Sequence, residues 1–140
     1  MATNETKLEP EYFSLKSQLL AHGSYTTNLA QSELLSVAVK VYAAGGENTM
    51  HQHPEEDHSF IVLQGQATFH VGSDENVKVV NKNEGIMLPA GSCYRFLSSA
   101  KENLVMIRVG AARQPPKVWR AFADGRPFDS QEFEKRKEKR

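Results

Sequence analysis

The chain alternates between short apolar stretches and turn residues, and this pattern predicts strands rather than helices. Residues 34–42 carry Val at positions 37, 39 and 41, the period of two that a half-buried strand shows. Seven shorter apolar stretches follow at a spacing of about eight to twelve residues, which is typical of antiparallel sandwiches and barrels. These stretches cover residues 49–53, 58–63, 67–71, 77–80, 85–88, 94–97 and 104–109. The sequence therefore predicts about eight strands that form one all-β barrel with an enclosed interior.

The two ends of the chain lack this alternation and are predicted to lie outside the barrel. Residues 1–12 are polar and are expected to be mobile, and residues 13–110 are expected to form the single domain. Within that domain, residues 13–20 fit a short helix and an irregular strand equally well. Residues 111–140 form a predicted C-terminal extension that is partly disordered, or that packs on the barrel or on a partner.

The amino-acid composition of the chain restricts the kinds of molecule that it is expected to bind. Of the 140 residues, 39% are apolar and 24% are charged, which is the balance of one soluble globular domain. Seventeen basic and seventeen acidic residues cancel, so no general attraction to nucleic acid or to an anionic membrane is expected. The apolar runs are too short to cross a bilayer, and we expect a cytoplasmic protein. Trp119 and Phe122 of the extension are expected to pack outside the barrel or against a second subunit.

A cluster of histidines is the strongest chemical signal in the sequence. Three of the five histidines, His51, His53 and His58, fall within eight residues. Because successive side chains of a strand alternate between its faces, His51 and His53 project to the same side. A returning strand that begins at His58 brings a third imidazole opposite this pair. The cluster therefore predicts a transition-metal site on three imidazoles.

Residues around the cluster have simpler expected roles. Glu56 and Asp57 are candidates to orient an imidazole by accepting its second N–H, although a solvated turn explains them equally well. His70 is out of phase with its core-facing neighbours and is expected at the surface. Cys93 is the only cysteine, so an internal disulfide and a Cys-rich zinc module are excluded, and it is expected to face outward without a catalytic role.

The order of these residues resembles the first motif of the cupin superfamily. That motif runs Gly, five residues, His-x-His, three or four residues, Glu, six residues, Gly. In this chain the matching positions are Gly45, His51, His53, His58 and Gly65. The spacing is kept throughout, and the one change of residue type is His58 in the place of the Glu.

A second cupin motif, Pro-x-Gly, two residues and His, is matched in part. Pro89 and Gly91 occupy their places, and Tyr94 stands where the motif has its histidine. The resemblance extends over residues 34–109 and implies a single-domain cupin with a jelly-roll β-barrel. Together with the exposed sheet edges that such a small barrel must cover, it also implies a homodimer.

The resemblance further implies a divalent transition metal, Fe, Ni, Zn or Mn, held by His51, His53 and His58. Tyr94 would then lie beside the metal as a hydrogen-bond donor or proton-transfer group, and simple packing at the barrel mouth is the equal alternative. An all-imidazole set with open positions favours a metal-dependent dioxygenase. A metal-dependent isomerase or decarboxylase, in which Tyr94 moves the proton, and a non-catalytic small-ligand-binding cupin are the alternatives.

Apolar residues with inward parity are expected to line the pocket, although ordinary core packing is their simplest role. They are Phe60, Val62, Phe69, Met87, Phe96 and Met106. Such a dry pocket predicts a small, largely apolar organic molecule as the ligand or substrate.

Overall fold

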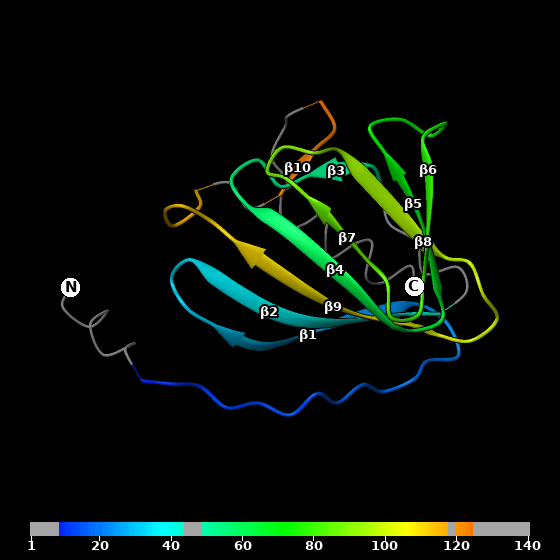
Figure 1. Cartoon of the computed structure of the whole chain (residues 1–140), viewed down its shortest axis with the longest axis horizontal. Helices are drawn as coiled ribbons and strands as arrows, with labels where there is room; N and C mark the ends of the chain where they lie inside the picture. Colours follow the sequence, from blue (N-terminus) through cyan, green and yellow to red (C-terminus); the bar gives the residue numbers. More distant parts are fainter. Residues whose placement is uncertain (1–8, 44–48, 118–119, 125–140) are drawn as a thin grey trace.

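Two antiparallel sheets face each other in the computed structural model, which describes residues 9–43, 49–117 and 120–124 (Figure 1). Within these residues the order of the first sheet is β1-β2-β9-β4-β7, and that of the second is β10-β3-β8-β5-β6. The strands are β1 (Ser24–Gln31), β2 (Leu35–Tyr42), β3 (His51–Gln52), β4 (Asp57–Gln64), β5 (Gln66–Val71), β6 (Val77–Asn81), β7 (Gly85–Leu88), β8 (Tyr94–Ser98), β9 (Leu104–Ala111) and β10 (Ala121–Phe122). The part of the chain that is described has no helix long and apolar enough to cross a membrane.

The strands confirm the all-β prediction, and their bounds follow the alternation closely. Each of the eight predicted stretches is a strand whose ends lie within two residues of the expected ones. Residues 13–20, for which helix and strand fitted equally well, adopt neither. The strand β1 was not predicted, because its pairing with β2 shifts register between Asn28 and Ala30. Such a shift breaks the period of two from which a strand is recognised.

The space between the sheets is filled by aromatic and aliphatic side chains. Phe60, Phe69 and Phe96 are at most 1% exposed, and their ring centroids lie 5.1 to 5.6 Å apart. These rings face each other from β4 in the first sheet and from β5 and β8 in the second. Burial of three aromatic rings at such distances holds the two sheets together.

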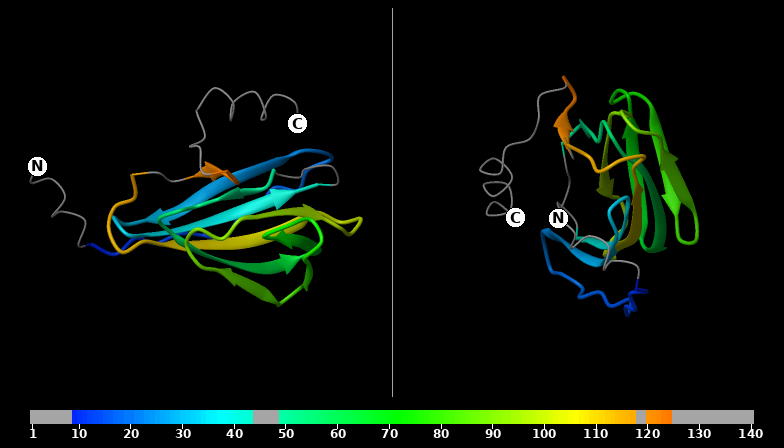
Figure 2. Two further views of the ribbon diagram at one scale, coloured as in Figure 1. Left: turned by 90° about the horizontal axis from the view of Figure 1, so that it is seen from above. Right: turned by 90° about the vertical axis from the view of Figure 1, so that its left-hand side faces the viewer.

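The outer face of the first sheet is covered by the segment that precedes β1. Val39, Val41 and Val105 form a second buried cluster on this face, and Leu20 packs against it. The side chain of Asn103 fixes this segment, because it accepts the N–H of Leu20 at 2.6 Å and donates to the carbonyl of Leu20 at 2.9 Å. Figure 2 shows the segment running along the outside of the first sheet. The valines of β2 therefore pack away from the barrel interior.

The described part of the C-terminal extension packs on the barrel. Strand β10 pairs with β3, with Phe122 opposite His51, so Phe122 extends the second sheet (Figure 2). The side chain of Gln52 donates to the carbonyl of Phe122 at 3.3 Å, and the N–H of Lys117 donates to the Glu55 carboxylate at 3.0 Å. The predictions for residues 1–8, Gly45, Trp119 and residues 125–140 lie outside the described residues.

Gly65, the last glycine of the first motif, sits in a turn that has no room for a side chain. Its φ is +83°, and a Cβ would lie 2.6 Å from the backbone oxygen of Asn103. We expect Gly65→Ala to lower the free energy of unfolding by about 3 kcal/mol, through backbone strain and the clash together. Gly91 has a similar φ of +84° with nothing within 4 Å, so Gly91→Ala should cost only about 1 kcal/mol. Urea unfolding measures both, and equal losses would contradict a contribution from the clash.

Candidate functional site

A cavity of about 560 Å³ lies between the two sheets. The first sheet contributes inward-facing side chains of β1, β2, β4 and β9, and the second contributes His51, Tyr94 and Phe96. Pro116 and Arg120 of the C-terminal extension also line the cavity. A volume of several hundred Å³ is typical of sites for small molecules.

The structure brings the three predicted histidines together beside this cavity. His51 lies in β3, His53 follows it, and His58 lies in β4 of the other sheet. The ring centroids of His51 and His53 are 5.1 Å apart, and those of His53 and His58 are 4.0 Å apart. Exposure is at most 5% for each histidine, so the cluster is withdrawn from solvent.

His51 is held in one tautomer. Burial lowers the pKa of His51 well below its ordinary value, and the positive charge of Arg120 lowers this pKa further. The imidazole is therefore neutral and carries a single N–H. Its Nδ1–H donates to the carbonyl oxygen of Thr49 at 2.6 Å, so the lone pair is on Nε2.

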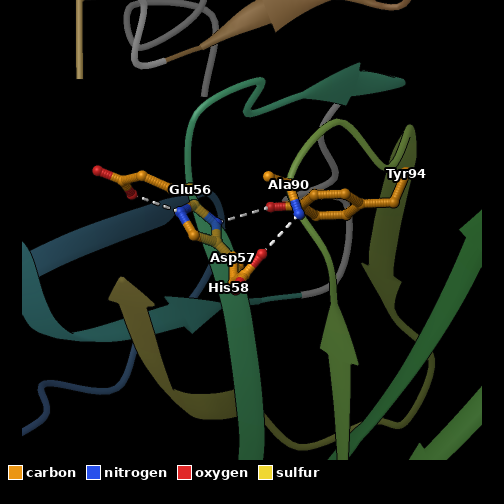
Figure 3. A network of polar contacts seen from close by, with 5 residues as sticks. All are labelled: Glu56, Asp57, His58, Ala90 and Tyr94. Atoms are coloured by element: carbon orange, nitrogen blue, oxygen red, sulfur yellow. Dashed lines mark hydrogen bonds and ion pairs between the residues drawn. The ribbon is translucent and has the colours of Figure 1, made fainter. Parts of the chain in front are cut away.

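His58 lies between a carboxylate and a phenol (Figure 3). Burial, together with the charges of His53 and Arg108, lowers the pKa of His58 to about 2, so this ring is also neutral. Because a carboxylate only accepts, Nε2–H of His58 donates to Oε1 of Glu56 at 2.9 Å. Nδ1 then accepts from the hydroxyl of Tyr94 at 3.4 Å. The contact with Glu56 is thus a hydrogen bond to a neutral imidazole and not an ion pair.

Tyr94 keeps its proton at neutral pH. Burial raises the pKa of Tyr94, although the positive charges of Arg108 and Arg120 act in the opposite direction. In the register of β3 and β8, Tyr94 lies opposite His51, and the two ring centroids are 4.5 Å apart. The phenol is therefore part of the histidine cluster, as a neutral hydrogen-bond donor.

The turn before β4 and a glycine of β9 shape this network. Of the two acidic candidates, Glu56 contacts His58, whereas Asp57 accepts the N–H of Ala90 at 2.8 Å (Figure 3). Gly110 leaves room for the pair, because a Cβ there would lie 2.9 Å from Oε1 of Glu56 and 3.2 Å from Cδ2 of His58. The hydrogen bond between Glu56 and His58 thus depends on a missing side chain on the neighbouring strand.

Comparison with known proteins agrees with this architecture. A family model described as the cupin domain matches residues 38–110. The chain belongs to the cupin family. Cupin domains commonly bind divalent metal ions and small molecules.

Individual relatives of this cupin are distant. It is 31% identical over 71 residues to the uncharacterized protein YdbB of Bacillus subtilis (strain 168), over 51% of this chain and 62% of the relative. The chain therefore spans less than two thirds of that relative. Among solved structures it resembles the cupin domain of Schizosaccharomyces pombe Cnp3, at 21% identity and a TM-score of 0.61, over 69% of this chain and 64% of that one. It also resembles an uncharacterized double-stranded β-helix protein of Klebsiella pneumoniae, at 17% identity and a TM-score of 0.62, over 86% and 94% of the two chains. These two likenesses show the fold.

The three histidines of this cupin do not form a metal-ligand set as they are arranged. Within residues 9–43, 49–117 and 120–124, no group of three or more His, Cys, Asp or Glu side chains is placed to hold a metal ion. Both ring nitrogens of His58 face protein groups, the carboxylate of Glu56 and the hydroxyl of Tyr94. Metal binding by the three histidines therefore stays a prediction, and we derive no step through a metal ion.

The predicted pocket residues divide into three groups. Phe60 and Phe96 line the cavity. Val62, Phe69 and Met106 are fully buried in the core cluster and take the simpler role of packing.

The assignment of Met87 to the pocket is wrong. Its side chain is 65% exposed. Strand β7 pairs with β4 so that Met87 lies opposite Ser59 on the outer face, while Leu88 lies opposite the inward-facing His58. In a strand of only four residues, the pairing with the neighbouring strand decides which face of the sheet each side chain takes. A register shift of one position moves every side chain to the opposite face.

Charged residues that were not expected at the site also line the cavity. Lys40, Arg108 and Arg120 are among its walls, so the pocket is not the dry, apolar one expected from the sequence. Two of them could have been predicted from the sequence, because Lys40 and Arg108 occupy inward-facing positions of largely apolar strands. Arg120 could not be predicted in this way, since it reaches the cavity through the pairing of β10 with β3.

Proposed function

We propose that this cupin binds a small organic molecule in the cavity between its sheets. The observation that carries the proposal is the cavity itself, about 560 Å³ in volume and lined by imidazole, phenol and aromatic side chains from both sheets. A concave site that combines aromatic side chains with converging polar groups is a usual form of a small-molecule site. The proposed binding does not require a metal held by three histidines.

The hydrogen-bond network around the histidines suits the cavity to orient a bound molecule. Glu56 fixes the His58 ring through Nε2–H, and Nδ1 of His58 accepts from Tyr94. Thr49 fixes His51 in the tautomer that has its lone pair on Nε2. Side chains that are neutral and already held in place lose little entropy on binding, and this favours affinity.

Filling the cavity with a large side chain tests this proposal directly. Thr26 of β1 lines the cavity, whereas its neighbour Thr27 projects from the opposite face of the same strand. Thr26→Trp should weaken binding of 2-naphthoate or 2-naphthamide about tenfold or more, because the indole occupies the space. Thr27→Trp should leave the affinity within about twofold. Isothermal titration measures both; an equal effect of the two variants, or no binding of either probe to the unaltered protein, would count against the proposal.

Metal-dependent chemistry is the second candidate, either oxidation by dioxygen or isomerisation or decarboxylation. One observation favours it, because the Thr49 carbonyl holds His51 in the tautomer that a metal ligand needs. The test is elemental analysis of protein purified without chelators or an affinity tag, beside a His51→Ala, His53→Ala double variant. Near one metal per chain, lost in the variant, supports this candidate. No metal after purification and after reconstitution contradicts it.

A further inference from the structure

The charges on the cavity wall are mostly positive. Among the described residues, Lys40 of β2, Arg108 of β9 and Arg120 before β10 line the cavity. The carboxylates on the same wall are Glu56 and Glu33, and Glu33 is exposed. A charge in contact with water is screened, so Glu33 offsets little of the interior positive charge. The enclosed part of the cavity therefore has more positive than negative charge.

Arg108 is the most deeply placed of these cations. It lies opposite both Ala38 and Phe60 in the first sheet and is only 5% exposed. Burial lowers the pKa of Arg108 and the negative charge of Glu56 acts in the opposite direction, but a guanidinium remains protonated in proteins. Holding such a charge away from water is costly unless negative groups lie close to it.

Lys40 lies next to Arg108 on the same face of the sheet. Arg108 is opposite Ala38 and Lys40 is opposite Met106, so the two cations are diagonal neighbours on β9 and β2. The ammonium group of Lys40 donates to the hydroxyl of Thr26 at 3.0 Å. Like charges at neighbouring positions of a sheet destabilise it, and an anion between them would remove that repulsion.

Arg120 brings a third positive charge to the same place from a distant part of the chain. The pairing of β10 with β3 holds Phe122 opposite His51, and Arg120, just before β10, lines the cavity. The positive charges of Arg120 and Lys40 both lower the pKa of His51, and those of all three cations lower the pKa of His58. The three cations therefore act on one small region of the cavity.

We propose that the ligand of this cavity is a small organic acid bound as its carboxylate anion, with Arg108 as the main anchor of the acidic group. Lys40 and Arg120 lie on either side of that group, and the apolar body of the acid packs against Phe60 and Phe96. A planar guanidinium matches a carboxylate through two parallel hydrogen bonds, which a neutral amide cannot reproduce. This inference rests on the proposed binding function and adds the chemical class of the ligand.

Matched pairs of a carboxylate and its amide test the inference. Benzoate with benzamide, and 2-naphthoate with 2-naphthamide, are titrated calorimetrically into the full-length protein. At least one carboxylate should bind about ten times more tightly than its amide, or better. This ratio corresponds to the free energy of a charge-assisted hydrogen bond. Arg108→Met should remove this preference, and Arg108→Lys should keep part of it. Arg95→Met is the matched control, because Arg95 bonds Asp74 outside the cavity.

The Arg108→Met variant should fold, because replacing a buried charge by an apolar side chain of similar size removes a desolvation cost. If thermal unfolding shows that it does not, Lys40→Met and Arg120→Met replace it, each lowering the preference about threefold.

Each remaining outcome has a distinct meaning. Amides that bind as tightly as their carboxylates overturn the anion inference and leave the proposed function standing. A preference that disappears at about 0.5 M salt also overturns it, because a surface attraction is screened and an enclosed one is not. Failure of both members of every pair to bind overturns the inference together with the proposed function.

Discussion

Phe69→Ala should lower the free energy of unfolding by about 4 kcal/mol. Phe69 is fully buried, and its ring centroid lies 5.1 Å from that of Phe96 and 5.4 Å from that of Phe60. The loss combines the transfer of the ring from water with the empty volume left between the sheets. A domain of this size is stable by about 5 to 15 kcal/mol in total, so the variant should lose at least about a quarter of its stability.

Met87→Ala is the matched control for this prediction. Because Met87 is 65% exposed on the outer face of β7, its truncation should change the free energy of unfolding by less than about 0.5 kcal/mol. Urea unfolding followed by circular dichroism measures both variants. Comparable losses in the two would contradict both the assigned core and the exposed position of Met87.

Acidification from pH 7 to pH 5 should lower the free energy of unfolding by about 2 kcal/mol through His58, and His51 should add to this loss. Burial lowers the pKa of both groups in the folded protein, and with a pKa of about 2 His58 takes up no proton in this range. In the unfolded chain both titrate near the ordinary value of about 6.5. The unfolded state therefore binds more protons below that pH, and the stability present above it is lost as the pH falls.

The slope of stability against pH separates this effect from other acid effects. Urea unfolding at pH 7, 6 and 5 should give a loss in His58→Gln that is smaller by about 2 kcal/mol, whatever the stability of that variant at pH 7. His70→Gln is the control, because His70 lies outside the cluster, where its ring bonds the carbonyl of Asp74 at 2.9 Å. An unchanged slope in His58→Gln would show that His58 is not held neutral.

The fold could be predicted from the sequence because most strands follow the period of two. That rule depends on uninterrupted pairing, and it failed for β1, where the register shifts after Asn28. It also failed at Met87, whose facing depends on a long-range partner, Ser59, that the sequence of β7 does not reveal. Regular local geometry is thus readable from sequence, whereas the choice of face in short or interrupted strands is not.

The candidate site, like the fold, could be predicted in part from the sequence. The proximity of His51, His53 and His58 follows from strand alternation and one turn, and the structure brings the three rings together. Their chemistry depends on partners from elsewhere, above all Glu56, which engages the His58 nitrogen, and Arg120, which arrives with β10. Such contacts arise from tertiary packing, and the spacing of the histidines carries no information about them.

The uneven pairing of the two sheets has a consequence for how the cavity changes shape. Within the described residues, β2 and β9 share eight register pairs, whereas β3 is joined to β8 by the single pair of His51 and Tyr94. Segments with few hydrogen bonds open first in native proteins, so the wall that carries His51 should detach transiently while the first sheet stays intact. The cavity would then change shape chiefly on the side of the second sheet, while the wall formed by the first sheet keeps its geometry.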